Sequence, residues 1–308
     1  MKITMLGTGH AVVTKYYNTC FTIDDRNEYF LVDGGGGSEI LRILEEIDIP
    51  LNKIHNIFVS HAHTDHLFGV IWVVRMIGQL MCQNKYQGVL KVYCHEGLED
   101  IIRSICGMVL ADKVTSLFDE RIMFVSIKDG ECFQVLGCEL TAFDVRSDKM
   151  KQYGFIMNYN GGKKIVFCGD EPLTETMEEI ASRCDWLLHE AFCLYSERDI
   201  FKPYEKAHST VKDACELAER LKCKNLLLFH TEDSHINERQ MLYKKEGMKY
   251  FSGMLHIPNH REIIELKEKL PFLFQMTLRQ LSYKIQVLFD FDIGWIICIQ
   301  LNLYLQTC

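Results

Sequence analysis

The sequence predicts an α/β fold, and three observations support this class. Short apolar stretches of strand type alternate along the chain with stretches whose apolar residues recur at helical spacing. Apolar residues make up 48% of the 308 residues, which is enough for a large core. Histidines and aspartates follow directly after several apolar stretches, where ligands gather in layered α/β proteins. Periodicity alone predicts no more than several strands combined with helices.

Strands are expected where β-branched, leucine and aromatic residues form short runs bounded by turn residues. The turn Asn160-Gly161-Gly162 separates two such runs and indicates a hairpin. Ser209-Thr210 is a suitable N-cap for one helix. The expected strands are residues 2–6, 20–23, 29–32, 56–59, 89–94, 139–143, 154–159, 164–168, 186–190 and 225–229, and the expected helices are residues 38–46, 66–80, 173–183, 209–221 and 237–247.

The most informative motif follows the expected strand 56–59. It places His61, His63, Asp65 and His66 within six positions. Imidazole nitrogens and carboxylate oxygens bind zinc and similar divalent metals. Four such groups exceed what one ion needs from a single loop, so the pattern favours a two-metal site. A polar loop that is merely rich in histidine would leave polar groups unpaired after a buried strand.

Further candidates lie at the ends of later strands. Asp170 and His230 each follow an apolar run, Glu190 ends another, and His208 precedes a predicted helix. Three of them have a simpler explanation: a capping or turn aspartate for Asp170, a hydrogen-bonded core histidine for His230, and a helix-start histidine for His208. Histidine titrates near neutral pH and a carboxylate can orient it, so Glu190 and His208 suit acid–base chemistry.

Together these motifs resemble the metallo-β-lactamase superfamily, and within it the ribonuclease Z-like branch. His-x-His-x-Asp-His is similar to the signature of the superfamily, and the resemblance covers residues 1–267. It implies a four-layer αββα sandwich that belongs to the α/β class. Residues 268–308 would then be an apolar extension. The matching segments are residues 3–9, 61–66, 167–170, 189–192, 208–210 and 228–231.

The resemblance also implies roles for these residues. His61, His63 and a third histidine should hold one metal, and Asp65, His66 and His230 the other, with Asp170 bridging. Glu190 and His208 should protonate the leaving group, and Asp65 is a candidate proton acceptor. The expected cofactor is Zn²⁺, as two ions or one, with Mn²⁺ and Fe²⁺ as open alternatives.

The chain departs from the family pattern at the third histidine. No histidine occurs between His95 and His189, and the best register places Arg146 where that ligand belongs. A guanidinium has no lone pair to donate to a metal. Several explanations stay open: the first metal site is weakened or empty, Asp144 or Asp148 replaces the ligand, Arg146 grips an anionic substrate group, or Arg146 points to solvent. All but the last make position 146 an altered-ligand or substrate position.

The glycine run after Asp33 admits two interpretations. Gly34 to Gly37 follow a strand and precede a helix, as phosphate-cradling loops do. However, the run lacks the lysine of a Walker loop and the spacing of a dinucleotide fingerprint. We favour a structural role, in which glycines let the backbone pass close beneath the metal loop.

Composition limits the partners and the compartment. The net charge of −8 argues against a broad polyanion-binding surface. Thirteen scattered cysteines without a C-x-x-C pair, and the absence of a secretory pattern at the start, predict reduced thiols in the cytoplasm. The apolar stretch 293–305 is shorter than a membrane span needs. The extension is therefore interpreted as a surface element, a homodimer contact or a segment without function rather than a membrane anchor.

These observations predict a metal-dependent hydrolase of phosphodiesters, with a small or nucleotide-derived substrate. The alternative is a ribonuclease Z that trims transfer RNA precursors. That enzyme carries an arm between the third histidine and the bridging aspartate, and only 24 positions separate Arg146 from Asp170. Transfer RNA is therefore the less favoured substrate. A metal-poor relative that binds a ligand without turnover is the third hypothesis.

Overall fold

The computed structural model describes residues 1–266. The chain divides into one unit that ends at Glu265 and a second that begins at Leu266, and the description below concerns the first unit. The expected extension, residues 268–308, lies outside the described residues. Its boundary and its role therefore stay predictions.

The first unit contains two seven-stranded sheets with matching internal organisation. The first sheet has the order β14-β1-β2-β3-β4-β5-β6; its neighbours from β14 to β3 are antiparallel and those from β3 to β6 are parallel. Its strands are β1 (Lys2–Gly7), β2 (Cys20–Asp25), β3 (Glu28–Val32), β4 (Ile54–Phe58), β5 (Leu90–His95), β6 (Ile122–Ile127) and β14 (Ile263–Glu265).

The second sheet repeats this pattern in the order β13-β12-β11-β10-β9-β8-β7. Neighbours from β7 to β10 are antiparallel and those from β10 to β13 are parallel. Its strands are β7 (Cys132–Val135), β8 (Cys138–Asp144), β9 (Tyr153–Tyr159), β10 (Lys163–Phe167), β11 (Trp186–Glu190), β12 (Asn225–Phe229) and β13 (Met254–His256).

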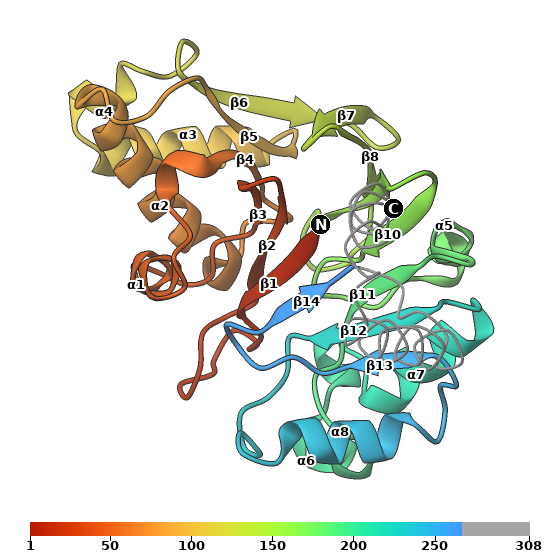
Figure 1. Ribbon diagram of the computed structural model, residues 1–308. Coiled ribbons are helices and arrows are strands. Elements are labelled where there is room, and N and C mark those ends of the chain that lie inside the picture. The colour runs from red at the N-terminus through yellow and green to blue at the C-terminus, as the bar shows by residue number, and fades with distance from the viewer. Residues whose placement is uncertain (267–308) are drawn as a thin grey trace, which may run out of the picture. The chain divides into compact units, whose positions relative to one another are not determined.

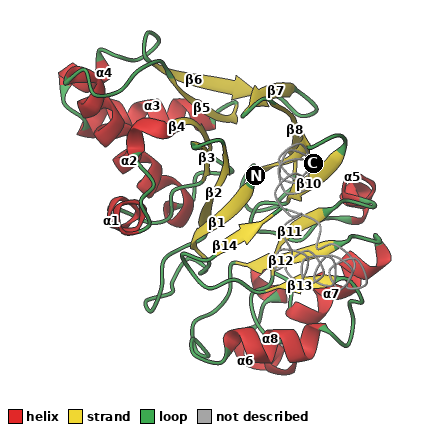
Figure 2. Ribbon diagram, in the orientation of Figure 1, coloured by secondary structure: helices red, strands yellow, loops and turns green. Residues whose placement is uncertain are grey.

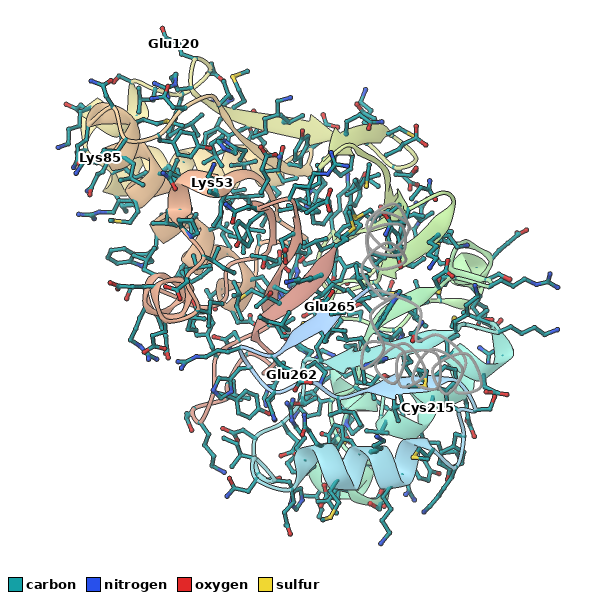
Figure 3. All side chains as sticks on the ribbon, viewed as in Figure 1. Lys53, Lys85, Glu120, Cys215, Glu262 and Glu265 are labelled. Carbon is teal, nitrogen blue, oxygen red and sulfur yellow. The ribbon has the colours of Figure 1, made fainter. Side chains whose placement is uncertain are left out.

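The helices lie outside the strands, as Figures 1 and 2 show. Helices α1 to α4 accompany the first sheet in the N-terminal half, and α5 to α8 accompany the second. Charged side chains such as Lys85 and Glu120 extend from the outer edge of the N-terminal half (Figure 3). The helices are α1 (Glu39–Glu46), α2 (Thr64–Cys82), α3 (Leu98–Val109), α4 (Asp112–Thr115), α5 (Glu178–Ala181), α6 (Arg198–Phe201), α7 (Val211–Arg220) and α8 (Arg239–Gly247).

Aromatic rings join the two sheets face to face. The ring centroids of Phe21 on β2 and Phe167 on β10 lie 5.3 Å apart, and those of Phe58 on β4 and Phe155 on β9 lie 5.2 Å apart. Both pairs meet edge to face, a favoured arrangement for buried rings. Because side chains alternate along a strand, Ile57 beside Phe58 belongs instead to the core under the helices.

Each outer face of the paired sheets carries a helix-covered core. Ile40 of α1, Val70 of α2 and Ile102 of α3 belong to one buried cluster with strands of the first sheet. Ala214 of α7 and Tyr243 of α8 belong to a second cluster with strands of the second sheet. The arrangement is a four-layer αββα sandwich, so the expected α/β fold class is confirmed.

Helix α2 is the one helix among residues 1–266 that is long and apolar enough to cross a membrane by length and composition. However, 61% of its apolar window is buried inside the fold. Val70, Val74 and Ile77 are completely buried in the N-terminal core cluster. We therefore assign α2 as a core helix, which carries the histidine motif at its amino end.

Candidate metal centre

The histidine motif forms the connection between β4 and α2. His61 lies in the loop, and Asp65 and His66 lie in the first turn of α2, all three nearly inaccessible to solvent. His63 precedes the helix and is partly exposed. The amino end of a helix favours negative charge, so Asp65 is well placed as a carboxylate. Strand β4 and helix α2 thus fix the motif on rigid elements.

Ligand-type atoms from both sheets converge on Asp170, which follows β10. Its Oδ2 lies 3.6 Å from Nε2 of His61, 3.6 Å from Nε2 of His66 and 3.5 Å from Nε2 of His230. Oδ2 of Asp65 lies 3.3 Å from Nε2 of His66 and 3.8 Å from Nε2 of His230. Asp170 therefore occupies the centre of the cluster, where the resemblance places a bridging ligand.

Three sets of three residues at this site satisfy the spacing of a metal site, with ligand atoms within 4.8 Å of one another in each. The sets are His61, His66 and Asp170; Asp65, His66 and His230; and Glu190, His208 and His230. His63 adjoins the first set, with its Nδ1 2.9 Å from Nε2 of His61. The structure thus brings together the six predicted ligand positions.

Unpaired buried atoms show that a cation fits this cluster. Nε2 of His66, both ring nitrogens of His230 and Oδ2 of Asp65 are buried without a hydrogen-bond partner. Leaving such atoms unpaired costs about 1–3 kcal/mol each. Nitrogen and carboxylate oxygen donors are those of zinc and related ions.

The protonation states of His61 and Asp170 suit metal binding. Burial lowers the pKa of His61 to about 4, so its ring is neutral at pH 7 and offers a lone pair. Burial alone would raise the pKa of Asp170, but His61, His66 and His230 outweigh it and hold that pKa well below its usual range. The central carboxylate is therefore ionised and can accept a cation.

Two supporting residues were not identified from the sequence as part of the site. Asp33, after β3, accepts hydrogen bonds from the backbone and hydroxyl of Ser60, and its Oδ2 lies 2.8 Å from Nδ1 of His66. Gln152 donates to Oδ1 of Asp170 at 2.7 Å and accepts from its backbone N–H at 2.7 Å. Partners of this kind orient metal ligands. Asp33 could have been predicted from the sequence, because it directly follows a strand as the ligands do. No sequence pattern identifies Gln152.

The glycine run allows close backbone packing under the metal loop. A Cβ on Gly34 would lie 2.2 Å from the backbone nitrogen of Val70, and a Cβ on Gly69 would lie 1.7 Å from the carbonyl oxygen of Gly34. No side chain fits at either position, so the loop after β3 packs directly on α2. The structural interpretation of Gly34 is confirmed.

Glu190 and His208 form a buried acid–base pair beside the cluster. Oε1 of Glu190 accepts a 2.5 Å hydrogen bond from the backbone N–H of Ser209, and its Oε2 lies 3.7 Å from Nδ1 of His208. Burial raises the pKa of Glu190 well above its usual value. Burial and the neighbouring His230 lower the pKa of His208 to about 2. Both shifts favour the uncharged form of the side chain, the protonated carboxyl of Glu190 and the neutral imidazole of His208.

A pocket of about 250 Å³ opens onto the cluster. Two lysines that the sequence did not single out reach it: Lys149, whose ammonium lies 3.4 Å from Glu171, and Lys206, whose ammonium lies 4.7 Å from the ring centroid of Phe192. They add positive charge next to the candidate metal ligands. The residues around the pocket include Asp65, Lys149, Asp170, Lys206, His208 and His230.

Arg146 does not occupy a ligand position, which corrects that expectation. Its guanidinium lies 2.6 Å from a carboxylate oxygen of Asp129, and its side chain is 56% exposed. The backbone of Arg146 has a φ of +63°, and its N–H bonds to Asp144, so the loop turns the side chain toward solvent. Asp148 is exposed as well. The structure thus supports the solvent-facing alternative.

Comparisons with known proteins agree with this fold. A family model described as anti-Pycsar protein Apyc1 matches residues 1–252. Ribonuclease Z of Enterococcus faecalis is 25% identical over 86% of this chain and 97% of the relative. The metallo-β-lactamase fold protein YhfI from Bacillus subtilis superposes with a TM-score of 0.69 at 17% identity, covering 85% of this chain and 98% of that one. The short form of human tRNase Z superposes with a TM-score of 0.67 at 20% identity, covering 87% and 100%.

Proposed function

Because the chain belongs to the anti-Pycsar protein Apyc1 family, in the ribonuclease Z-like branch of the metallo-β-lactamase superfamily, we propose that it hydrolyses small phosphodiesters. The coarser assignment, a metal-dependent hydrolase, follows from the relatives together with the His/Asp clusters. The single observation that carries the finer proposal is the pocket at those clusters. It combines candidate metal ligands, the imidazole of His208 and two lysines in one small cavity.

The pocket favours a small substrate. Ligand pockets of drug-sized molecules measure about 300–1,000 Å³, and this one measures about 250 Å³. Lys149 and Lys206 supply two positive charges that a phosphate group can contact. A nucleotide-derived phosphodiester meets both conditions, since it is compact and carries its negative charge at the reacting phosphorus.

The segment between Arg146 and Asp170 contains no inserted arm that could grip transfer RNA. After the loop it consists of β9 and β10, and residues 155–159 of β9 pair with residues 163–167 of β10 around the turn at residues 160–162. The expected hairpin is present, and the chain passes from one strand to the next without an inserted arm. The ribonuclease Z alternative draws its support from the relatives of that name and is an outcome of the test below.

Different residues of the site would bind metal, position the phosphate and accept a proton. His61, His63, Asp65, His66, Asp170 and His230 would hold divalent metal, proposed as Zn²⁺, with two ions or one. When bound, such metal supplies a Lewis acid and activates water near neutral pH. Lys149 and Lys206 position the anionic phosphate, and Asp65 accepts a proton from the attacking water.

Glu190 and His208 would act on the leaving group. His208 reaches the pocket, whereas Glu190 is completely buried behind it. With a protonated Glu190 behind it, a neutral His208 would pass its ring proton to the leaving oxygen and recover a proton from Glu190. The departing alcohol therefore leaves neutral.

The free thiols of residues 1–266 support a reducing compartment, and we propose the cytoplasm. Every cysteine in this part of the chain is unpaired, and most are buried. Disulfides are rare where glutathione and thioredoxin keep thiols reduced.

The proposal is tested by assaying metal-reconstituted protein on bis(p-nitrophenyl) phosphate and on nucleotide phosphodiesters. We expect turnover that is abolished by a chelator and by His66→Ala. Site-specific cleavage of a transfer RNA precursor with weak turnover of every small phosphodiester would favour ribonuclease Z. Tight metal binding with no turnover of any substrate would favour the non-catalytic relative.

A further inference from the structure

A second group of metal-ligand type lies outside the candidate metal centre. It consists of Glu197, Glu232 and His235, whose ligand atoms lie within 4.8 Å of one another, and we refer to it as the lateral cluster. Glu197 ends the short turn Tyr195–Glu197 that follows β11. Glu232 and His235 lie in the loop that follows β12. Its members thus come from two separate loops that run side by side.

The lateral cluster carries unpaired buried oxygens. Glu232 is only 3% exposed, and its Oε2 accepts hydrogen bonds from the backbone and hydroxyl of Ser234. Its other oxygen, Oε1, and Oε2 of Glu197 are buried without a partner. Within residues 1–266, the other carboxylates with such an oxygen are Asp65 and Glu190, both at the candidate metal centre. The lateral cluster therefore shares the feature that marks that centre.

No positively charged side chain of residues 1–266 other than His235 forms an ion pair with either carboxylate. Nε2 of His235 lies 2.7 Å from Oε1 of Glu197. Arg198 is adjacent in sequence, but its guanidinium bonds to the carbonyl of Tyr195 and pairs with Asp199. Two carboxylates with unpaired oxygens and one imidazole leave an excess of negative charge in a largely buried place. Buried charge of this kind needs a counter-ion.

We propose that Glu197, Glu232 and His235 bind a divalent transition-metal ion, separate from the catalytic metals. Two carboxylates and one imidazole are hard and borderline ligands, which suit Zn²⁺ and Mn²⁺. Glu197 and His235 are partly exposed, so water can complete the coordination and the ion can enter. Cys193 does not belong to the set of residues whose ligand atoms meet this spacing.

The ion would clamp the two loops that carry catalytic groups. The loop after β11 leads on from Glu190 through Phe192, and the loop after β12 starts at His230. A single backbone hydrogen bond, from Glu232 to the carbonyl of Phe192 at 2.8 Å, already ties them together. A metal at the lateral cluster would reinforce this bond and the His235–Glu197 contact through residues that do not line the pocket. Its effect is therefore expected on stability before activity.

Metal content and thermal unfolding test this site in a chain whose catalytic centre is disabled. The background is the full-length His66→Ala protein, into which Glu197→Gln is introduced; Glu238→Gln in the same background is the matched control. Glu238 is an exposed acidic residue in the same loop that lies outside the cluster. After reconstitution with Zn²⁺ or Mn²⁺, we expect Glu197→Gln to bind one equivalent less metal than the background and to lose its metal-dependent rise in Tm.

A second substitution guards against a folding defect. His235→Asn changes a partly exposed side chain and should give the same loss of one equivalent, with an unchanged circular dichroism spectrum. Equal metal content and equal Tm response in the background, Glu197→Gln and Glu238→Gln would overturn the proposal. The cluster would then be a hydrated ion pair. Because the readouts are metal content and unfolding in an inactive background, this result is independent of whether the protein hydrolyses phosphodiesters.

Discussion

At the scale of single residues, Asp33 is the most informative side chain outside the predicted ligand set. It orients His66 by bonding to the ring nitrogen that faces away from the cluster. We expect Asp33→Ala to weaken metal binding about 10–100-fold, as loss of such a partner typically does. Competition with a chelator measures this affinity. Asp129→Ala, which removes an exposed carboxylate far from the pocket lining, should leave it unchanged.

His208 is expected to act on the leaving group rather than on metal. General acid catalysis contributes about 10²–10⁴-fold, so His208→Ala should lower turnover by that order with unchanged metal content. The loss should be smaller for p-nitrophenolate, which leaves without protonation. Equal losses for good and poor leaving groups would reduce His208 to a positioning residue.

The pH profile reports on Glu190. Its pKa is raised by burial, so the protonated form that supplies the proton prevails below the raised pKa and is lost as pH rises through it. The contribution of Glu190 to the free energy of unfolding should also fall as pH rises, because its pKa is higher in the folded than in the unfolded state. We expect turnover of substrates with poor leaving groups to fall on the alkaline side, and Glu190→Gln to remove that limb. An alkaline limb that persists in the variant would assign it to another group.

The sequence predicts site residues best where several ligands share one loop. It predicts them poorly where the position of a side chain depends on a partner from a distant segment of the chain. Spacing alone identifies four candidate ligands, namely His61, His63, Asp65 and His66. Arg146 could not be placed, because its side-chain direction depends on a left-handed backbone turn and on Asp129. We expect Arg146→His to leave metal content unchanged, which elemental analysis can check. A gain of one equivalent would return this position to the ligand set.

At the scale of elements, the contact between the glycine loop and α2 positions the histidine motif. Gly69→Ala should destabilise the protein and lower its metal affinity, because the new Cβ would lie 1.7 Å from the carbonyl oxygen of Gly34. Gly107→Ala in α3 is the matched control, since a Cβ there meets nothing within 4 Å. It should stabilise the chain by roughly 0.5–1 kcal/mol, the usual difference between the two residues in a helix. Denaturant unfolding separates the two outcomes.

The sequence pattern does not predict several elements that the structure contains. Helix α3 was not predicted, although its buried residues Leu98, Ile102 and Cys106 recur every fourth position. Strands β6, β7 and β13 were also missed, and β7 and β13 are only four and three residues long. The predicted helix 173–183 reduces to a turn and the four residues of α5, and it ends near Arg183, which has a φ of +54°.

At the scale of the whole molecule, the candidate metal centre connects the two sheets. His61 and His66 follow β4 of the first sheet, whereas Asp170 and His230 follow β10 and β12 of the second. Metal should therefore stabilise the fold as a whole. Saturation at about 100 times Kd stabilises by about 2.7 kcal/mol, which should raise Tm by about 5 °C or more. Calorimetry with and without chelator measures this shift, and His66→Ala should lose most of it.

The sequence alone supports the α/β class, and the four layers came from the resemblance. Strand order could not be derived, because the pairing of β14 with β1 joins segments from opposite ends of the first unit. Local patterns carry no information about such distant partners. The pocket could not be derived either, since Lys149 and Lys206 reach it from loops without a motif.

The most direct test of the account compares kcat/KM of one metal-reconstituted preparation on a small nucleotide phosphodiester and on a transfer RNA precursor. The pocket of about 250 Å³ and the direct β9–β10 hairpin predict a clear preference for the small substrate, abolished in His66→Ala. A preference for the precursor, with cleavage at a single 3′ site, would contradict the central claim.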